Sequence, residues 1–350
     1  MVYFRTDANA VIATGHVMRC LTIADEFIPC RQKVCFIVSD EESAILIKKR
    51  KYPYIVTKSK WDQIDIEAEY QMLYERAKYG DILIVDSYYI HSYYLSKMRA
   101  VFKVAVFDDM FSEQKDADII INYNVFYRKF DYRERYKNKK CRLLLGQTYV
   151  PLRSQFRDLK PETKVRDSCH LHVLLMCGGG DKENMILNCL EWLAQKNQKL
   201  LNQLRWNVVI GSYYPDPRKL NAFADRFSHM EVSANVENMA EMMQKSDLCI
   251  TAASTVLYEC CAMQLPTIFF VVAEDQKYDA EFFEKDGMML YCGDFKADRG
   301  NSLMRMNEYL EELVRSRERR QSMKALMGKY IDGFGAKRIV HAILETAGND

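Results

Sequence analysis

The 350-residue sequence lacks several features that would fix its class at once. No run of about 18 apolar residues is present, so no membrane span is expected. Neither charge dominates, because 50 basic side chains stand against 48 acidic ones, and nucleic acid is therefore not an expected partner. Low-complexity tracts and repeats of solenoid length are also missing. The first residues do not follow the layout of a signal peptide, which leads us to expect a cytoplasmic protein.

The cysteines lack the spacing of a metal or redox site. Eleven are present, none in a Cys-x-x-Cys pair, and several fall in predicted strands and helices, so we expect reduced, structural thiols. Cys169, His170 and His172 stand close together, but alternation along a strand places the two histidines on one face without a second ligand pair nearby. We therefore predict no metal and no other cofactor.

Apolar, β-branched runs alternate with helical patterns along the whole chain. The predicted strands are 2–4, 33–38, 82–85, 104–107, 119–121, 143–145, 171–176, 206–210, 248–251 and 267–272, and the predicted helices include 17–27, 184–194, 236–244, 280–285 and 302–330. This alternation of strands and helices predicts an α/β protein with two Rossmann-like, doubly wound domains facing a cleft. The polar, proline-containing stretch 151–168 separates a domain at 1–155 from one at 165–350.

A histidine beside a glycine stands between the first strand and the first helix. Arg5 and Asp7 close the apolar run, and Gly15 and His16 open the helical pattern that follows. In open α/β sheets this position faces the ligand crevice, so His16 is the candidate catalytic residue. A structural histidine with both ring nitrogens satisfied is the alternative.

Polar residues also follow two later strands of the first half. Asp86 and Tyr88 end one strand region and Asp108 ends the next, at the sheet edge predicted for His16. Tyr88 is the better candidate ligand, because a phenol offers a flat apolar face and a hydrogen-bonding tip to a sugar ring. The two aspartates could instead cap helices or brace loops.

The second half opens with a glycine-rich turn between a strand and a helix. Gly178 and Gly179 let backbone N–H groups approach a ligand closely, and the helix start after Asp181 favours an anion such as phosphate. Neither a Walker loop nor a G-x-G-x-x-G fingerprint is present. A tight turn without a ligand remains the alternative.

A second turn of small residues in this half precedes another helix. Ala253, Ser254 and Thr255 stand at the helix start, where the hydroxyls and free N–H groups form a second cradle for a diphosphate. Glu259, one turn later, is placed to accept hydrogen bonds from a ribose diol. A capped helix with a surface glutamate is the alternative.

These motifs occur together in one order: Arg5-x-Asp7, Gly15-His16-x-x-Arg19, Val85-Asp86-Ser87-Tyr88, Phe107-Asp108-Asp109, Gly178-Gly179-x-Asp181 and Ala253-Ser254-Thr255-x-x-x-Glu259. On them the chain resembles the UDP-sugar hydrolases of pseudaminic acid biosynthesis, which are grouped with spore coat polysaccharide biosynthesis proteins. The resemblance implies the two-domain glycosyltransferase B architecture. It also implies metal-independent hydrolysis of a UDP-linked 2,4-diacetamido-2,4,6-trideoxy hexose to UDP and free sugar, with inversion at C1.

The resemblance assigns roles to residues of this chain. His16 matches the base that activates water; Arg5, Asp7, Gly15, Arg19, Tyr88, Asp275 and Gln276 match substrate-binding positions; Gly178, Gly179, Asp181, Ala253, Ser254, Thr255 and Glu259 match nucleotide-binding ones. Two positions depart from the family pattern. Ala13 replaces a common glycine, and Asp275 replaces an asparagine, which exchanges a donor for a carboxylate that repels diphosphate.

Two other functions fit the same motifs. A glycosyltransferase of this fold would move the sugar to an acceptor instead of water, and a non-catalytic protein would only bind the UDP-sugar. A small-molecule UDP-sugar is the expected partner in each case, and the sequence is compatible with a monomer.

Overall fold

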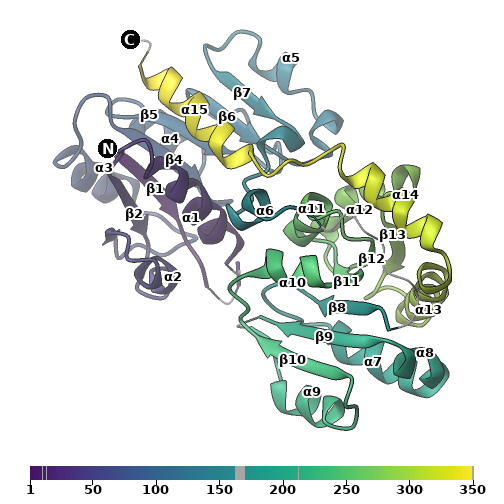
Figure 1. The fold of residues 1–350 in the computed structure, drawn as a ribbon. Coiled ribbons are helices and arrows are strands. Elements are labelled where there is room, and N and C mark those ends of the chain that lie inside the picture. Colours follow the sequence, from purple (N-terminus) through teal and green to yellow (C-terminus); the bar gives the residue numbers. More distant parts are fainter. Residues whose placement is uncertain (10, 13, 162–169, 212, 349–350) are drawn as a thin grey trace. The chain divides into compact units, whose positions relative to one another are not determined.

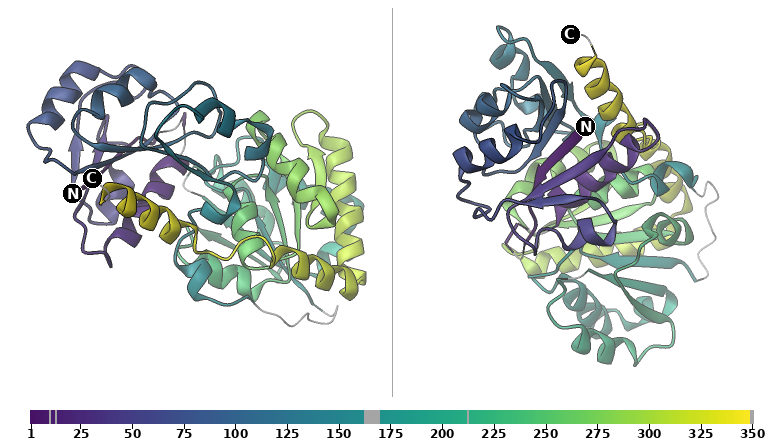
Figure 2. Two further views of the ribbon diagram at one scale, coloured as in Figure 1. Left: turned by 90° about the horizontal axis from the view of Figure 1, so that it is seen from above. Right: turned by 90° about the vertical axis from the view of Figure 1, so that its left-hand side faces the viewer.

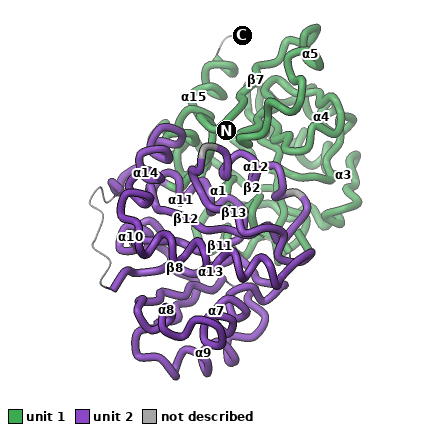
Figure 3. Tube along the Cα trace, turned by 90° about the vertical axis from the view of Figure 1, so that its right-hand side faces the viewer, with its two compact units in different colours: residues 1–153, 334–350 green, residues 154–333 purple. Residues whose placement is uncertain are grey.

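The chain folds into two compact units. The computed structural model describes residues 1–9, 11–12, 14–161, 170–211 and 213–348. Unit 1 comprises residues 1–153 and 334–350, and unit 2 comprises residues 154–333 (Figure 3). Each unit has one parallel sheet with helices packed against it (Figure 1). The predicted α/β class, with two Rossmann-like sheets, is therefore confirmed.

The sheet of unit 1 is built around its first strand. In the described residues its strands are β1 (Val2–Thr6), β2 (Val34–Val38), β3 (Tyr54–Val56), β4 (Ile82–Asp86), β5 (Lys103–Phe107), β6 (Ile119–Asn122) and β7 (Arg142–Leu145). They are parallel and stand in the order β3-β2-β1-β4-β5-β6-β7. The order reverses between β1 and β4, and in such sheets ligands bind at the carboxyl ends of the strands at that point.

Helices bury both faces of this sheet. They are α1 (Gly15–Phe27), α2 (Ile45–Lys49), α3 (Ile66–Tyr74), α4 (Ser92–Met98), α5 (Tyr132–Tyr136), α15 (Gly335–Ala347) and the 3₁₀ turns η1 (Tyr127–Lys129) and η2 (Gln147–Tyr149). Alternation along β1 sends Phe4 to one face, where its ring lies 6.1 Å from that of Phe27 on α1. Tyr3 points to the other face, into a core shared with Leu73 of α3 and Leu95 of α4. Burial on both faces explains the continuous apolar strands.

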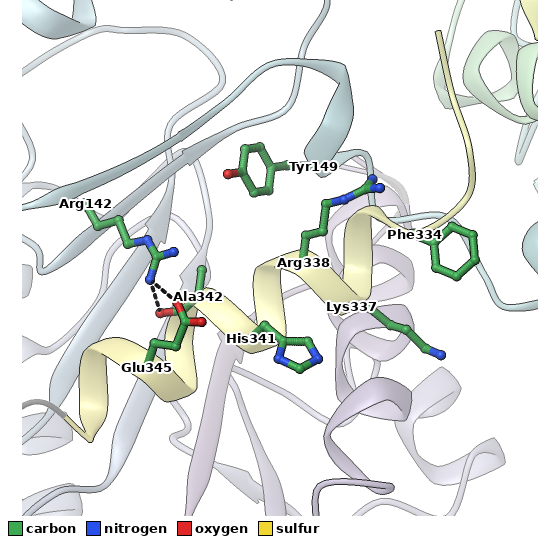
Figure 4. Close-up of a pocket in the computed structure, with 8 residues that line it drawn as sticks. All are labelled: Arg142, Tyr149, Phe334, Lys337, Arg338, His341, Ala342 and Glu345. Atoms are coloured by element: carbon green, nitrogen blue, oxygen red, sulfur yellow. Dashed lines mark hydrogen bonds and ion pairs between the residues drawn. The ribbon is translucent and has the colours of Figure 1, made fainter. Parts of the chain in front are cut away.

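The last helix corrects the predicted domain division, which placed residues 334–350 in the second domain. Helix α15 lies beside α1 of unit 1 (Figure 2). Arg142 of β7 donates to Glu345 at 2.8 Å and to the Ala342 carbonyl at 3.2 Å (Figure 4). Arg338 donates to the Thr148 carbonyl at 3.0 Å. These side chains line a cavity of about 410 Å³ that contains none of the predicted site residues.

Gly335 sets how closely α15 approaches unit 1. A Cβ at this position would lie 2.1 Å from the Val150 carbonyl oxygen, which is backbone and cannot turn aside. We expect Gly335→Ala to lower the free energy of unfolding by about 1–3 kcal/mol, measured by urea denaturation. Gly300→Ala is the control, since a Cβ there meets nothing within 4 Å. Equal stability of the two variants would contradict the close approach.

Unit 2 has the same architecture, with a second parallel sheet. In the described residues its strands are β8 (His172–Met176), β9 (Arg205–Ile210), β10 (Met230–Ala234), β11 (Leu248–Ala252), β12 (Thr267–Val271) and β13 (Leu290–Asp294), in the order β10-β9-β8-β11-β12-β13. Its helices are α6 (Gln155–Asp158), α7 (Met185–Lys196), α8 (Gln198–Gln203), α9 (Pro217–Ala224), α10 (Met239–Lys245), α11 (Thr255–Ala262), α12 (Lys277–Glu284), α13 (Arg299–Arg315) and α14 (Arg317–Met327), with η3 (Glu274–Gln276) and η4 (Lys285–Gly287). The order reverses between β8 and β11.

Several elements differ from the sequence-based prediction. Edge strands β3, β10 and β13 were not predicted. The single helix predicted at 302–330 is two helices, because Ser316 leaves the helical conformation and its hydroxyl accepts a hydrogen bond from the Arg319 N–H at 3.1 Å. Across the described ranges, no helix has the length and apolar character needed to cross a bilayer.

Candidate active site

His16 lies at the point where the strand order of unit 1 reverses. It occupies the first turn of α1, directly after the loop that leaves β1, and Asp86 ends the neighbouring strand β4. The two side chains meet, with His16 Nδ1 2.6 Å from Asp86 Oδ1. Both are buried. The sequence predicted that these residues share one sheet edge, and the structure places them in direct contact.

Arg19, one turn after His16, forms ion pairs with the carboxylates at this edge of the sheet. Its guanidinium donates to both oxygens of Asp86 and, at 2.8 Å, to Asp109 at the end of β5. The Tyr123 hydroxyl accepts a further bond at 3.0 Å, and the guanidinium lies 4.3 Å from the centre of the Phe107 ring. Arg19 thus links the ends of β4, β5 and β6, and a bidentate, stacked site of this kind requires arginine rather than lysine.

The charge of Asp86 determines which nitrogen of His16 carries a proton. Burial alone would raise the pKa of this carboxyl, but Arg19 and then His16 outweigh burial and hold the pKa well below its ordinary value. An ionised carboxylate only accepts hydrogen bonds, so His16 Nδ1 is the donor. Nε2 is then the basic nitrogen of the neutral ring. Within the described ranges Nε2 has no hydrogen-bond partner and is not among the fully buried polar atoms.

Tyr88 and Gly15 border the exposed side of this histidine. The Tyr88 ring meets the His16 ring edge to face, with centroids 4.5 Å apart. Burial raises the pKa of the Tyr88 phenol, which keeps it neutral and able to donate. A Cβ added to Gly15 would meet nothing within 4 Å, so open space lies at the start of α1. Asp108 instead braces its own loop and accepts from the Phe111 N–H at 3.1 Å, as the structural alternative predicted.

Arg5 and Asp7 form a separate, fully buried cluster, which corrects their predicted contact with substrate. Strand β1 extends to Thr6, so Arg5 lies inside the sheet rather than in the loop. Its guanidinium donates to Asp7 at 2.5 Å, to Glu69 at 2.9 Å and to the Ser39 hydroxyl at 3.0 Å. Every side of the guanidinium is occupied, and the residue has no exposed surface. The pair therefore braces β1 rather than meeting a ligand.

The glycine-rich turn of unit 2 packs against the end of β9. A Cβ on Gly211 would lie 2.4 Å from the Gly179 carbonyl oxygen, so only glycine permits this approach. Gly178 adopts a φ of +74°, in the left-handed region that favours glycine. Asp181 uses both carboxylate oxygens to accept the N–H groups of Met185 and Ile186, at 2.7 and 2.9 Å. Asp181 therefore fixes the turn, and the backbone of the turn is the part left to meet a ligand.

The second predicted cradle lies beside the first. A Cβ on Gly178 would be 3.8 Å from Ser254 Oγ, so the turns after the neighbouring strands β8 and β11 meet. Ser254 caps α11 by accepting the Val256 N–H at 3.3 Å, while Ala253 is buried and Thr255 is exposed at the helix start. Glu259 is half-buried one turn later. The structure thus brings together the two turns that the sequence predicted separately.

Gln276 has a local role in the structure. Its side-chain oxygen accepts the Val272 N–H at 2.9 Å, which braces the segment after β12. Ala13 and the side chain of Asp275 lie outside the described residues. Asp109 belongs to the strand-end motif Phe107-Asp108-Asp109 but was assigned no contact, and Tyr123 was not predicted; both side chains bind Arg19. No sequence pattern marks Tyr123.

Known proteins resemble this chain in part of its sequence and in its fold. Residues 172–339 match the model of the glycosyltransferase family 28 C-terminal domain. MurG of Acinetobacter baumannii has a similar structure, with a TM-score of 0.65 and 14% identity over 98% of this chain and 99% of that one. The chain therefore has the two-domain glycosyltransferase B fold that the sequence resemblance implied.

Two relatives by sequence are more specific. An uncharacterized protein of Methanocaldococcus jannaschii is 26% identical over 281 residues, which make up 78% of this chain and 56% of that protein. The match thus spans little more than half the length of the archaeal relative. The UDP-2,4-diacetamido-2,4,6-trideoxy-beta-L-altropyranose hydrolase of Campylobacter jejuni is 25% identical over 290 residues, which make up 82% of this chain and 97% of the hydrolase.

Proposed function

We propose that the protein is a hydrolase that splits a UDP-linked acetamido-deoxyhexose into UDP and free sugar, in the biosynthesis of a pseudaminic-type acid or surface polysaccharide. One observation carries the proposal: His16 is held by an ionised carboxylate at Nδ1 and keeps Nε2 without a partner in the described chain. That is the arrangement of a general base oriented by a second group. The likeness to the Campylobacter hydrolase supports water as the acceptor.

The reaction follows from this arrangement. Nε2 of His16 accepts a proton from water as the water oxygen bonds to the anomeric carbon. The bond from that carbon to the oxygen of the β-phosphate breaks, and its electron pair leaves with UDP. Attack from the side opposite the leaving group inverts the configuration at C1. Asp86 keeps its own charge throughout and stabilises the imidazolium that forms.

The turns of unit 2 are the proposed nucleotide site. Backbone N–H groups at Gly178 and Gly179 and the start of α11 at Ser254 would hold the diphosphate, whose negative charge grows as UDP leaves. The contact between these turns supports one shared anion site. Glu259, one turn into α11, is the proposed acceptor for the ribose hydroxyls. No metal is needed in this scheme, because backbone dipoles balance the leaving charge.

A glycosyltransferase is the second candidate. The match of residues 172–339 to the glycosyltransferase family 28 C-terminal domain favours it specifically. In that case His16 would take the proton from an acceptor hydroxyl rather than from water. The two functions therefore share the base and the nucleotide site, and differ only in the nucleophile.

Release of UDP in plain buffer tests the proposal. We expect the purified protein to release UDP from an N-acetylated UDP-deoxyhexose without any acceptor, at the same rate with and without EDTA. A coupled assay would follow UDP, and proton NMR would follow the first sugar anomer formed. UDP release only when a lipid-linked or saccharide acceptor is added would reject the hydrolase in favour of the transferase.

A further inference from the structure

Exposed apolar side chains gather at the carboxyl edge of the unit 1 sheet. Val11 follows β1, Tyr88 and Tyr89 follow β4, and Met110 follows β5, with exposed fractions of 69%, 50%, 39% and 54%. These three strands are neighbours in the sheet. The four residues therefore belong to loops at the same edge of the sheet as His16 and Asp86. Large apolar residues that face solvent at a ligand edge are typical of a binding surface.

Trp61 joins this surface from a distant part of the sheet. It lies in the connection between β3 and α3, and its ring meets the Tyr89 ring edge to face with centroids 4.7 Å apart. Strand β3 stands three places from β4, which at the usual strand spacing is roughly 14 Å. The connection after β3 thus extends along the edge as far as the loop after β4. Neither β3 nor α3 itself requires this connection to extend so far along the edge of the sheet.

Two successive tyrosines connect this apolar surface with the proposed base, His16. Tyr88 packs on His16, and the next residue, Tyr89, packs on Trp61. Tyr88, Tyr89 and Trp61 offer aromatic rings rather than cationic groups, so they suit the uncharged part of a nucleotide sugar rather than its diphosphate. Methyl groups of acetamido and deoxy substituents are the apolar features that distinguish such sugars from plain hexoses.

We propose that Trp61 and Tyr89 form a wall that contacts the acyl substituents of the sugar and selects N-acylated nucleotide sugars over fully hydroxylated ones. This inference rests on the proposed function, since it assumes that the ligand is a UDP-sugar. Tyr89 contacts the acyl group, and Trp61 positions the Tyr89 ring. The nucleotide and the base retain the roles given above.

Binding of three probes tests the wall without turnover. Calorimetry would measure Kd for UDP-N-acetylglucosamine, UDP-glucose and UDP, where the first two differ only in the acetamido group. We expect the wild-type protein to prefer UDP-N-acetylglucosamine by about tenfold over UDP-glucose, the size of an apolar contact of a few carbon atoms. Tyr89→Ala should reduce that ratio to about one and leave Kd for UDP unchanged.

Matched variants distinguish the loss of a contact with the sugar from a loss of protein structure. Tyr89→Phe keeps the ring and should keep the ratio, while Trp61→Ala should lower it. Tyr79→Ala is the control, because Tyr79 is 96% exposed and precedes β4 at the opposite edge of the sheet. An unchanged ratio in Tyr89→Ala, or an equal loss for all three probes, overturns the wall. Lack of binding of any probe by the wild-type protein would instead overturn the proposed function and the wall with it.

Discussion

Replacing His16 with alanine is expected to lower kcat by about 10²–10⁴-fold, the usual contribution of a general base. Kd for UDP should stay within a few fold of the wild-type value, since the proposed nucleotide residues all belong to unit 2. The loss follows because water then attacks the anomeric carbon without a group to take its proton. Steady-state UDP release and calorimetry with UDP would measure the two quantities.

His91 supplies the matched control for this variant. It is an exposed histidine that also pairs with one carboxylate, Glu113, at 3.1 Å. His91→Ala should retain full activity. Wild-type turnover in His16→Ala would remove His16 from the mechanism and return it to the structural role that the sequence left open.

Replacing Arg19 with methionine is expected to have two large effects. The free energy of unfolding at pH 7 should fall by about 3–5 kcal/mol, because the variant leaves two poorly exposed carboxylates, Asp86 and Asp109, without their cation. Activity should also change its pH dependence. Without Arg19, burial dominates and the pKa of Asp86 rises, so the orientation of His16 is lost at a higher pH than in the wild-type protein.

Asp86 stabilises the wild-type fold at neutral pH. Its folded pKa lies below the unfolded value of about 3.9, so ionised Asp86 stabilises the wild-type fold above that pH. This contribution is lost as the pH falls toward the folded pKa. In Arg19→Met the pKa of Asp86 is higher, so both this stability and the contact that orients His16 are lost at a higher pH, and the acid limb of the kcat profile should move to higher pH.

Arg99→Met is the control for Arg19→Met, since Arg99 also bridges two aspartates, Asp116 and Asp118, but nearer the surface. Its acid limb should match that of the wild-type protein. Identical profiles for both variants would show that Arg19 does not control the ionisation of Asp86. Urea unfolding and rate profiles from pH 4 to 8 are the measurements.

The sequence predicted the central strands well because burial on both faces makes them continuous apolar runs. It missed β3, β10 and β13, which lie at sheet edges and are short or partly exposed rather than continuously buried. It also placed α15 in the wrong unit. The docking of that helix depends on Gly335 and on contacts with β7 that are about 200 residues away in the chain, which local patterns do not encode.

Some residues of the candidate site were predicted from the sequence and others were not. Strand ends in a parallel sheet meet at one edge, so His16, Asp86 and Tyr88 could be grouped from their positions alone. Arg5 was misassigned because β1 continues two residues past the predicted apolar run, which turns a loop residue into a core residue. Asp181 and Gln276 accept hydrogen bonds from backbone N–H groups. A polar residue in a turn can have this role or can bind a ligand, and the sequence does not distinguish the two.

Hydrolysis in ¹⁸O-enriched water tests the central claim most directly. If His16 directs water to the anomeric carbon, mass spectrometry of a single turnover will find the label in the C1 hydroxyl of the released sugar and none in UDP. Label in the β-phosphate of UDP would show attack at phosphorus, and it would contradict the proposed mechanism.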